Sequence, residues 1–432
     1  MCFHKIAVHT HPYRASSKKV IMTSDHRRYA IVGNGFAGTT AAEHLRKIDP
    51  TASIVMFGDE PYTLYNRIAL PPMLRKQVAP AKVIIRDLAW HEKHAIDLHL
   101  STRVDSIDVA DKVVHANGTA YPYDALLLAT GGRPNRSEAP GAAGAHNVLN
   151  FQYMDDTVEL SAQLETAKTA VAVGGSFIAY ELAEAFASRG VETHWLVRGP
   201  RFLRRLLDEI AGEMVDDAAR EDGVHVHYEE EVRAFVRSNG SVTKVITKNG
   251  TEIAADLVGI GLGLTMNTEI VVGTGIETKT GIVCDDRLET GVKGIFAAGD
   301  IAEFYDPIAE INYRMGTWNN AGAHGKVVAI NMAGGDERYH DVPEYSSKLF
   351  TQQTITQFGI SPEYRDDLET VRHIDREKKH YRALFFWKNR LAGCVMIGKG
   401  NRAGKRKYLD AIKSKTEFAP NEREALLQWT AD

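Results

Sequence analysis

Two glycine-rich turns in the sequence have the residue types and spacing of backbone phosphate sites. The first, GNGFAG at 33–38, lies between an apolar stretch at 29–32 and a helical stretch at 39–48. Its glycines permit a tight turn, let a diphosphate approach the backbone, and let helix and strand pack closely. The turn predicts a dinucleotide site, and a purely structural turn is the alternative. The residues expected at the diphosphate are Gly33, Gly35, Phe36, Ala37 and Gly38.

The segments around this turn supply the other expected nucleotide contacts. The helix N-terminus offers free N–H groups and a positive dipole to phosphates. A second apolar stretch at 53–57 completes a βαβ unit with parallel strands. Asp59 or Glu60, just after it, would accept hydrogen bonds from a ribose, at slightly more than the usual spacing of about 20 residues.

The second turn follows the apolar stretch at 170–173, precedes an expected helix at 180–188, and departs from the ideal pattern. Its glycine positions hold Gly174, Ser176 and Ala179, with Phe177 and Ile178 between them. Ser176 adds a side chain where a diphosphate should approach, and Ala179 should loosen the helix packing slightly. Two such units in one chain predict two nucleotides bound side by side.

The strand after the second turn, at 193–197, ends in Arg198 instead of an acid. Arginine can bind a 2′-phosphate bidentately, whereas an acid would repel one. Arg201, Arg204 and Arg205 extend this basic cluster, with Arg204 also expected at the coenzyme. The cluster favours NADPH over NADH. A solvated basic loop beside an NADH site is the alternative.

Other elements must position these turns. Residues 98–114 are expected to be strands, with Val104 on the cofactor side, and 123–130 and 294–300 to be buried strands. Residues 318–332 are expected to form a helix. The last ninety or so residues mix short strands with two expected helices, as in an α+β domain.

Several ordered motifs together resemble the FAD-dependent pyridine-nucleotide oxidoreductases of the ferredoxin and rubredoxin reductase type. The match runs from about 29 to 335, and the chain is also similar to the flavin-binding part of assimilatory nitrite reductases. The resemblance implies that the first turn binds FAD and the second NAD(P)H. It assigns to Glu181 the catalytic position that faces the nicotinamide. It implies further cofactor contacts at Arg67 (after Tyr65-Asn66), at Ala129, Thr130 and Gly131, at Gly299 and Asp300, and at Trp318.

The sequence departs from this family in its cysteines and near the arginine loop. A CxxxxC pair after the first turn is missing, and so is a single cysteine before Arg67. Thiolate chemistry would need Cys284 or Cys394, and Cys284 lies in an apolar stretch where a thiol is inert. The family's serine and lysine after the arginine are replaced by Pro71 and Pro72, so any tuning of the flavin potential by that lysine is absent.

Composition bounds the remaining possibilities. A chain of 432 residues is too long to form a single hydrophobic core. Its net charge of -4 does not favour nucleic acid as a binding partner. Apolar stretches are strand-sized, so no membrane span is expected. Three scattered cysteines fit a reducing cytoplasm, and no metal site is predicted. The extension at 1–28 is expected to be disordered; a transit peptide, or a metal site from Cys2 and nearby histidines, is less favoured.

The expected fold class is α/β: two Rossmann-like FAD- and NAD(P)-binding domains, the first discontinuous, plus a C-terminal α+β domain. The expected boundaries are 29–149 with 273–341 for FAD, 150–272 for NAD(P), and 342–432 for the C-terminal domain. The expected enzyme takes a hydride from NAD(P)H onto FAD and passes electrons to a carrier protein, ferredoxin or rubredoxin. Alternatives are a small-molecule acceptor (oxygen, a quinone or a disulfide) or a nucleotide-binding regulatory module. A homodimer through the C-terminal domain is left open.

Overall fold

The computed structural model describes residues 26–350 and 353–429, and it is built on two five-stranded parallel sheets. Of the extension at 1–28, residues 1–25, with Cys2 and the histidines near it, lie outside the described residues. Residues 26–28 are described and Arg28 begins β1, so the expectation of disorder is wrong for them. The first sheet has the order β19-β7-β1-β2-β3. Its strands are β1 (Arg28–Val32), β2 (Ser53–Phe57), β3 (Ile96–His99), β7 (Ala125–Leu128) and β19 (Ile295–Ala297). A strand from late in the chain thus completes the sheet, as expected of a discontinuous domain.

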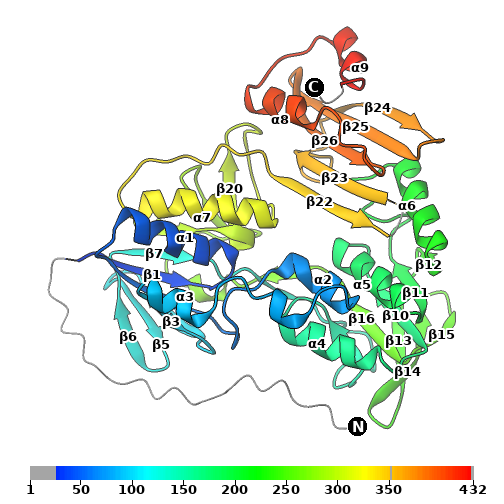
Figure 1. The fold of residues 1–432 in the computed structure, drawn as a ribbon, viewed down its shortest axis with the longest axis horizontal. Coiled ribbons are helices and arrows are strands. Elements are labelled where there is room, and N and C mark those ends of the chain that lie inside the picture. Colours follow the sequence, from blue (N-terminus) through cyan, green and yellow to red (C-terminus); the bar gives the residue numbers. More distant parts are fainter. Residues whose placement is uncertain (1–25, 351–352, 430–432) are drawn as a thin grey trace.

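Two helices far apart in sequence cover one face of this sheet. α1 (Phe36–Ile48) and α7 (Trp318–Met332) lie side by side in Figure 1, one blue and one yellow. Gly325 allows the close contact, because a Cβ there would clash with the carbonyl of Ala37. The close contact fixes the starts of both helices next to each other at the carboxyl ends of the strands.

The second parallel sheet has the order β12-β11-β10-β16-β9. Its strands are β9 (Val148–Asn150), β10 (Thr169–Val173), β11 (Glu192–Val197), β12 (Val224–Tyr228) and β16 (Leu257–Ile260). The helices around it are α2 (Leu70–Leu74), α4 (Met154–Gln163), α5 (Phe177–Ser188) and α6 (Glu209–Glu221). β10 and β16 are buried along almost their whole length, as in parallel sheets covered on both faces.

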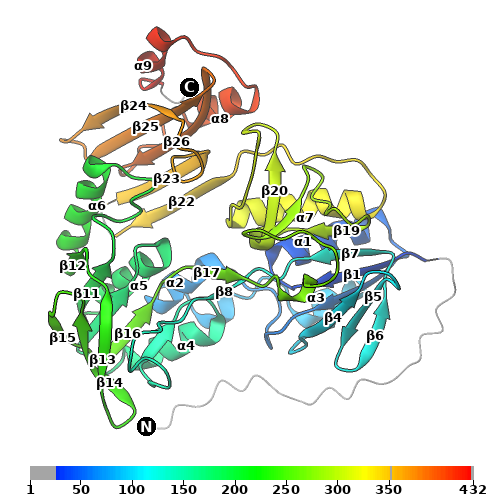
Figure 2. The ribbon, with the colours of Figure 1, turned by 180° about the vertical axis from the view of Figure 1, so that it is seen from behind.

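Smaller sheets flank and connect the two. Figure 2 shows the β8–β17 pair between the two large sheets. Three antiparallel or mixed sheets, at the flanks, and the helix α3 (Leu88–Lys93) complete this part of the chain. The strands are β4 (Val104–Asp108), β5 (Val113–Ala116), β6 (Thr119–Pro122), β8 (Gly132–Pro134), β13 (Val232–Ser238), β14 (Ser241–Thr247), β15 (Glu252–Ala254), β17 (Leu264–Met266), β18 (Ile282–Cys284), β20 (Ala302–Asp306) and β21 (Ile311–Tyr313).

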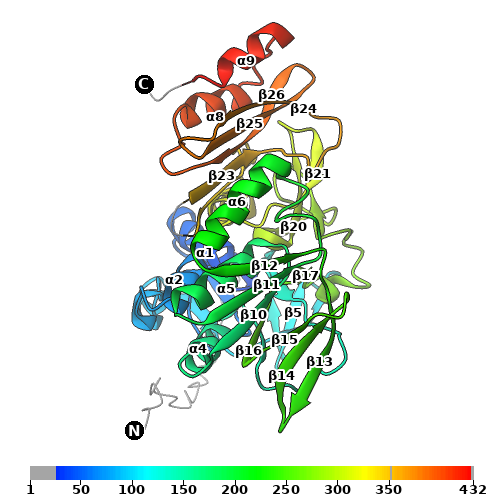
Figure 3. The same cartoon turned by 90° about the vertical axis from the view of Figure 1, so that its right-hand side faces the viewer.

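The C-terminal part is an antiparallel sheet of order β22-β23-β26-β25-β24 with α8 and α9 beside it. Figures 1 and 2 show β22 and β23 on the side of this sheet that is nearer to α5 and α6, and Figure 3 shows β23 next to α6. The elements are β22 (Glu344–Leu349), β23 (Gln353–Gly359), β24 (Glu369–Asp375), β25 (His380–Trp387), β26 (Arg390–Ile397), α8 (Lys405–Lys413) and α9 (Arg423–Leu426).

These elements confirm the expected fold class, with two differences at helix starts. α1 begins at Phe36 instead of Thr39, and α5 at Phe177 instead of Tyr180. The reason is that each glycine-rich turn contains the first helical residues. No helix among the described residues is long and apolar enough to cross a membrane.

Candidate functional site

The first turn has the backbone geometry that a diphosphate needs. Gly33 has φ +115°, and a Cβ there would clash with the carbonyl of Ala129. A Cβ at Gly38 would clash with the carbonyl of Gly33, so helix and strand pack as closely as expected. A Cβ at Gly35 would meet nothing within 4 Å, and no side chain caps the start of α1. The N–H groups of Phe36, Ala37 and Gly38 are therefore open to an anion.

Of the two acids predicted at the ribose, only Asp59 is exposed at the end of β2. The Glu60 carboxylate instead accepts hydrogen bonds from Tyr65 at 2.8 Å and from Arg67 at 2.7 Å. Burial raises the pKa of Glu60, and the charge of Arg67 opposes that shift. Residues 101–104 run beside this edge, since Ser101 N–H donates to the Glu60 carbonyl, and Val104 is buried there.

Arg67 joins the loop after β2 to the segment before α4. Besides Glu60, its guanidinium donates to the Gln152 carbonyl at 2.6 Å and lies over the rings of Tyr65 and Tyr153. Burial raises the pKa of Asp300, and the charges of Arg67 and then Arg314 oppose that shift. Arg67 and Asp300, far apart in sequence, are therefore close enough in the fold to interact electrostatically.

The other residues predicted for the first nucleotide also gather here. Gly299 has φ +76°, and its N–H donates to Nδ1 of buried His324. Burial lowers the pKa of His324 to about 3, so this histidine is neutral and structural. Trp318, the first residue of α7, stacks on Phe36, the first residue of α1, with ring centroids 4.0 Å apart.

The segment Ala129-Thr130-Gly131 links the two nucleotide sites. Ala129 N–H donates to the Val32 carbonyl, which continues the β1–β7 ladder towards the first turn. Thr130 exchanges two side-chain hydrogen bonds with Asn267, at 3.1 and 2.8 Å, and Gly131 has φ +57°. The chain then enters β8, which pairs with β17. This crossing places the two glycine-rich turns in one connected framework.

The second turn is better built than its sequence suggests. Ser176 Oγ donates to the Gly261 carbonyl at 2.8 Å, so the hydroxyl is bound to the neighbouring strand end. A Cβ at Gly261, the residue just after β16, would lie 2.6 Å from the Ala179 nitrogen. The absence of a side chain at Gly261 therefore leaves the space that Ala179 occupies. Gly174 has φ +132° and lies against the same carbonyl. The expectation of looser packing at Ala179 is wrong for this reason.

The start of α5 contacts the C-terminal sheet. Phe177 packs against Tyr345 of β22 with ring centroids 4.0 Å apart, and Ile178 packs, partly buried, against the apolar core around α5. No side chain caps this helix at Ser176. Its first N–H groups are thus available to a second diphosphate.

The predicted basic cluster divides in the structure. Arg198 is 75% exposed, and its Nε lies 3.7 Å from Glu231. Arg201 donates to the Leu207 carbonyl at 2.7 Å, so it braces its own loop. The aliphatic part of Arg204 lies against Gly199. Arg198 and Arg204 are therefore the members next to the end of β11.

Glu181 lies one turn into α5, beside a buried ion pair that the sequence analysis missed. Arg75 Nη1 lies 2.7 Å from Glu184 Oε2, and the two side chains are 10% and 9% exposed. Burial raises the pKa of Glu181 to about 8, with Arg75 opposing and Glu184 adding to the shift. Four site residues were not identified from the sequence: Arg75, Glu184, Tyr345 and Gly261. Of these, only Gly261 has a local signal, the spaced glycines at 259, 261 and 263.

The two described cysteines are both free and buried. Burial raises the pKa of each thiol, and nearby carboxylates add to the shift at Cys284. A thiolate is therefore disfavoured at both. The burial of Cys284 agrees with what its apolar stretch predicts.

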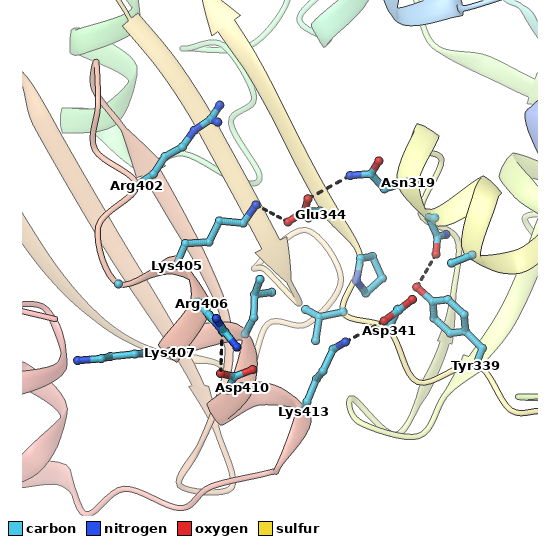
Figure 4. A pocket seen from close by; sticks show the side chains of 16 residues that line it. Asn319, Tyr339, Asp341, Glu344, Arg402, Lys405, Arg406, Lys407, Asp410 and Lys413 are labelled. Atoms are coloured by element: carbon cyan, nitrogen blue, oxygen red, sulfur yellow. Dashed lines mark hydrogen bonds and ion pairs between the residues drawn. The ribbon is translucent and has the colours of Figure 1, made fainter. Parts of the chain in front are cut away.

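A cavity of about 830 Å³ opens between the start of α7 and α8. Asn319 and Asn320 of α7 line one side, and Figure 4 shows basic side chains of α8 and its preceding loop on the other. The basic lining residues are Arg402, Lys405, Arg406, Lys407 and Lys413. Three acids also line it and form ion pairs: Asp341 with Lys413, Glu344 with Lys405, and Asp410 with Arg406.

Comparison with known proteins agrees with this arrangement. The chain is 34% identical over 319 residues to the anthranilate 1,2-dioxygenase system ferredoxin–NAD(+) reductase component of Burkholderia cepacia, covering 73% of this chain and 78% of the relative. It is 27% identical over 379 residues to a rubredoxin-NAD(+) reductase of Ectopseudomonas oleovorans, covering 87% and 96%. It is 26% identical over 412 residues to the nitrite reductase [NAD(P)H] of Bacillus subtilis (strain 168), covering 93% of this chain and about half (49%) of that protein.

A solved structure of the covalent putidaredoxin reductase–putidaredoxin complex has the same fold. It superposes with a TM-score of 0.85 at 24% identity, covering 91% of this chain and 95% of the other. A family model described as pyridine nucleotide-disulphide oxidoreductase matches residues 27–325. This chain therefore belongs to the pyridine nucleotide-disulphide oxidoreductase family.

Proposed function

We propose that this protein is an FAD-dependent NAD(P)H oxidoreductase that passes electrons to a small carrier protein, a ferredoxin or a rubredoxin. The observation that supports it most is the pair of glycine-rich turns, each at the carboxyl ends of a parallel sheet and joined through Thr130 and Asn267. Relatives whose names include ferredoxin–NAD(+) reductase and rubredoxin-NAD(+) reductase are 34% and 27% identical to this chain over 73% and 87% of its length.

The residues around the first turn fit FAD. Gly35 leaves room for the diphosphate, Gly33 and Gly38 permit the close packing of strand and helix around it, and Asp59 is the exposed acid for the ribose. Arg67, Asp300 and the start of α7 face the flavin end, where the helix dipole favours negative charge. When bound, FAD supplies the chemistry that converts a hydride into electrons delivered one at a time. The chain's own part is to hold and align the two rings and to exclude water.

The second turn and α5 fit the nicotinamide coenzyme, with Glu181 at the nicotinamide. At neutral pH the raised pKa keeps the Glu181 carboxyl protonated, so it can donate a hydrogen bond. A neutral acid also avoids placing a negative charge beside a flavin that becomes more negative on reduction. Arg198 and Arg204 are proposed to contact the adenosine end.

Arg198→Glu should shift the coenzyme preference towards NADH. A 2′-phosphate would lose a charge-assisted contact and meet a like charge, so we expect the NADPH/NADH ratio of kcat/KM to fall about 10-fold or more. Steady-state kinetics with both coenzymes measures it, and Arg233→Glu on exposed β13 is a matched control. An unchanged ratio would remove Arg198 from the coenzyme site.

We place the carrier at the α8 basic face, defined as Arg402, Lys405, Arg406, Lys407 and Lys413. Residues 399–415 contain seven Lys or Arg and one Asp, a net charge of +6 in a chain whose net charge is -4. This face shares a cavity with Asn319 and Asn320, next to Trp318 at the flavin end of α7. An acidic face on the carrier would be steered there, close to the flavin.

The domain boundaries are proposed as 29–149 with 273–341, 150–272, and 342–432, supported by β19 joining the first sheet. A cytoplasmic location is proposed because the two described cysteines are free thiols.

Stopped-flow spectroscopy tests this function. The purified protein should be yellow, should bleach on mixing with NADPH or NADH, and should recover colour on mixing with an oxidised ferredoxin or rubredoxin. Faster recovery with oxygen or a quinone than with either carrier would favour a small-molecule acceptor. A colourless protein that takes up no added FAD would contradict the proposal.

A further inference from the structure

A buried ion pair holds α2 against α5 at the candidate nicotinamide site. α2 and α5 lie side by side in Figures 1 and 2, and Arg75, at the end of α2, reaches Glu184 of α5 at 2.7 Å. Both side chains are at most 10% exposed. A buried pair is expensive to desolvate, and apolar residues of similar size often replace such a pair without loss of stability. A contribution to folding stability therefore does not by itself explain why this ion pair is present.

Glu181 lies three residues before Glu184, on the neighbouring turn of α5, so both carboxyls are within the influence of one guanidinium. Arg75 is the larger of the two charge effects on Glu181, and the negative charge of Glu184 is the smaller. Tyr180 and Tyr345 also face Glu181, and their phenols are neutral because burial raises the pKa of both. The remaining charged groups act on Glu184: Lys348 of β22 and Asp222 after α6.

We propose that Arg75 and Glu184 are positioning residues for hydride transfer. The ion pair with Glu184 holds Arg75, so that Arg75 does not pair with Glu181 and stabilise it as a carboxylate. An arginine beside Glu181 without this partner would pair with it and fix it as an anion. The observed pairing leaves Glu181 as a neutral acid that can donate to the nicotinamide. This inference rests on the proposed function, because it requires Glu181 to face the coenzyme.

Two substitutions should move the pH dependence of flavin reduction in opposite directions. In the wild type the rate should fall as pH rises through the Glu181 pKa of about 8, because the acid loses its proton. Arg75→Gln removes the cation that favours the carboxylate, so the midpoint should move up by about half a pH unit or more. Glu184→Gln removes an anion and releases Arg75 towards Glu181, so the midpoint should move down by about half a unit or more.

The measurement is the stopped-flow rate of flavin reduction from pH 6 to 10, together with NADPH and NADH affinities from fluorescence quenching and unfolding midpoints at each pH. Glu181→Gln should abolish the pH dependence, and Arg75→Lys should restore the wild-type midpoint. Arg189→Gln is the matched control. Arg189, at the end of α5, also connects α5 to α2, because it donates to the Leu74 carbonyl at 3.0 Å. Its ion-pair partner is Glu165, away from Glu181.

The outcomes separate this inference from the proposed function. A wild-type protein without flavin, or without reduction by either coenzyme, would contradict both. A wild type that is reduced, with midpoints that shift in the same direction or not at all in Arg75→Gln and Glu184→Gln, would overturn the positioning role alone. If Arg75→Gln fails to fold, Glu184→Gln still tests the inference. A downward shift of its pH midpoint supports the positioning role, because a pair with a purely structural role predicts no shift.

Discussion

A Gly35→Val protein should fold normally and be colourless. Gly35 has φ −69°, which valine adopts readily, and its Cβ would meet no protein atom within 4 Å. The isopropyl group would instead occupy the space over the start of α1 where the proposed diphosphate lies, and it would block the N–H groups there. We therefore expect essentially complete loss of bound flavin with an unfolding midpoint close to that of flavin-free wild type. Absorbance at flavin wavelengths and thermal unfolding measure the two.

Gly291→Val is the matched control for this substitution. A Cβ at Gly291 also meets nothing within 4 Å, and that position lies away from both glycine-rich turns. This variant should be as yellow as wild type. Full flavin content in Gly35→Val would contradict the placement of the diphosphate, and equal flavin loss in both variants would make the effect nonspecific.

Reversing two charges on the α8 basic face should weaken carrier reduction. Arg406 is 96% exposed with one distant partner, Asp410 at 4.0 Å, and exposed Arg402 donates to Ser346 at 2.6 Å. Arg402→Glu with Arg406→Glu changes the local charge by four units while removing little packing. We expect KM for a ferredoxin, with putidaredoxin as the probe, to rise about 10-fold or more at low salt and the salt dependence to weaken.

The control carries the same charge change on another face. Arg233→Glu with Lys248→Glu alters two exposed cations of the β13–β15 sheet. Flavin reduction by the coenzyme, measured without a carrier, reports whether either pair disturbs the rest of the enzyme. If both double variants raise KM equally, net charge and not this face would govern association. If neither does, the carrier docks elsewhere.

Much of the framework was predictable because it depends on local backbone requirements. A strand that turns sharply into a helix around a phosphate needs glycines at fixed intervals, so Gly33, Gly35 and Gly38 identified the first site directly. Apolar runs of strand length identified β1, β7 and β10 for a similar reason, since buried parallel strands are apolar along their length. The helix 318–332 was predicted with the bounds that the structure has.

Side chains whose partners are distant in sequence acquire their contacts only when the chain folds. The sequence predicts two dinucleotide turns and the order of the motifs around them. It left Asp59 and Glu60 equivalent, whereas the fold commits Glu60 to Arg67. It suggested that Ser176 weakens the second turn, whereas in the fold the Ser176 hydroxyl donates a hydrogen bond to the Gly261 carbonyl. It gave no sign of Arg75 beside Glu184, 109 residues away, because a pair of opposite charges has no local pattern until folding brings the two helices together.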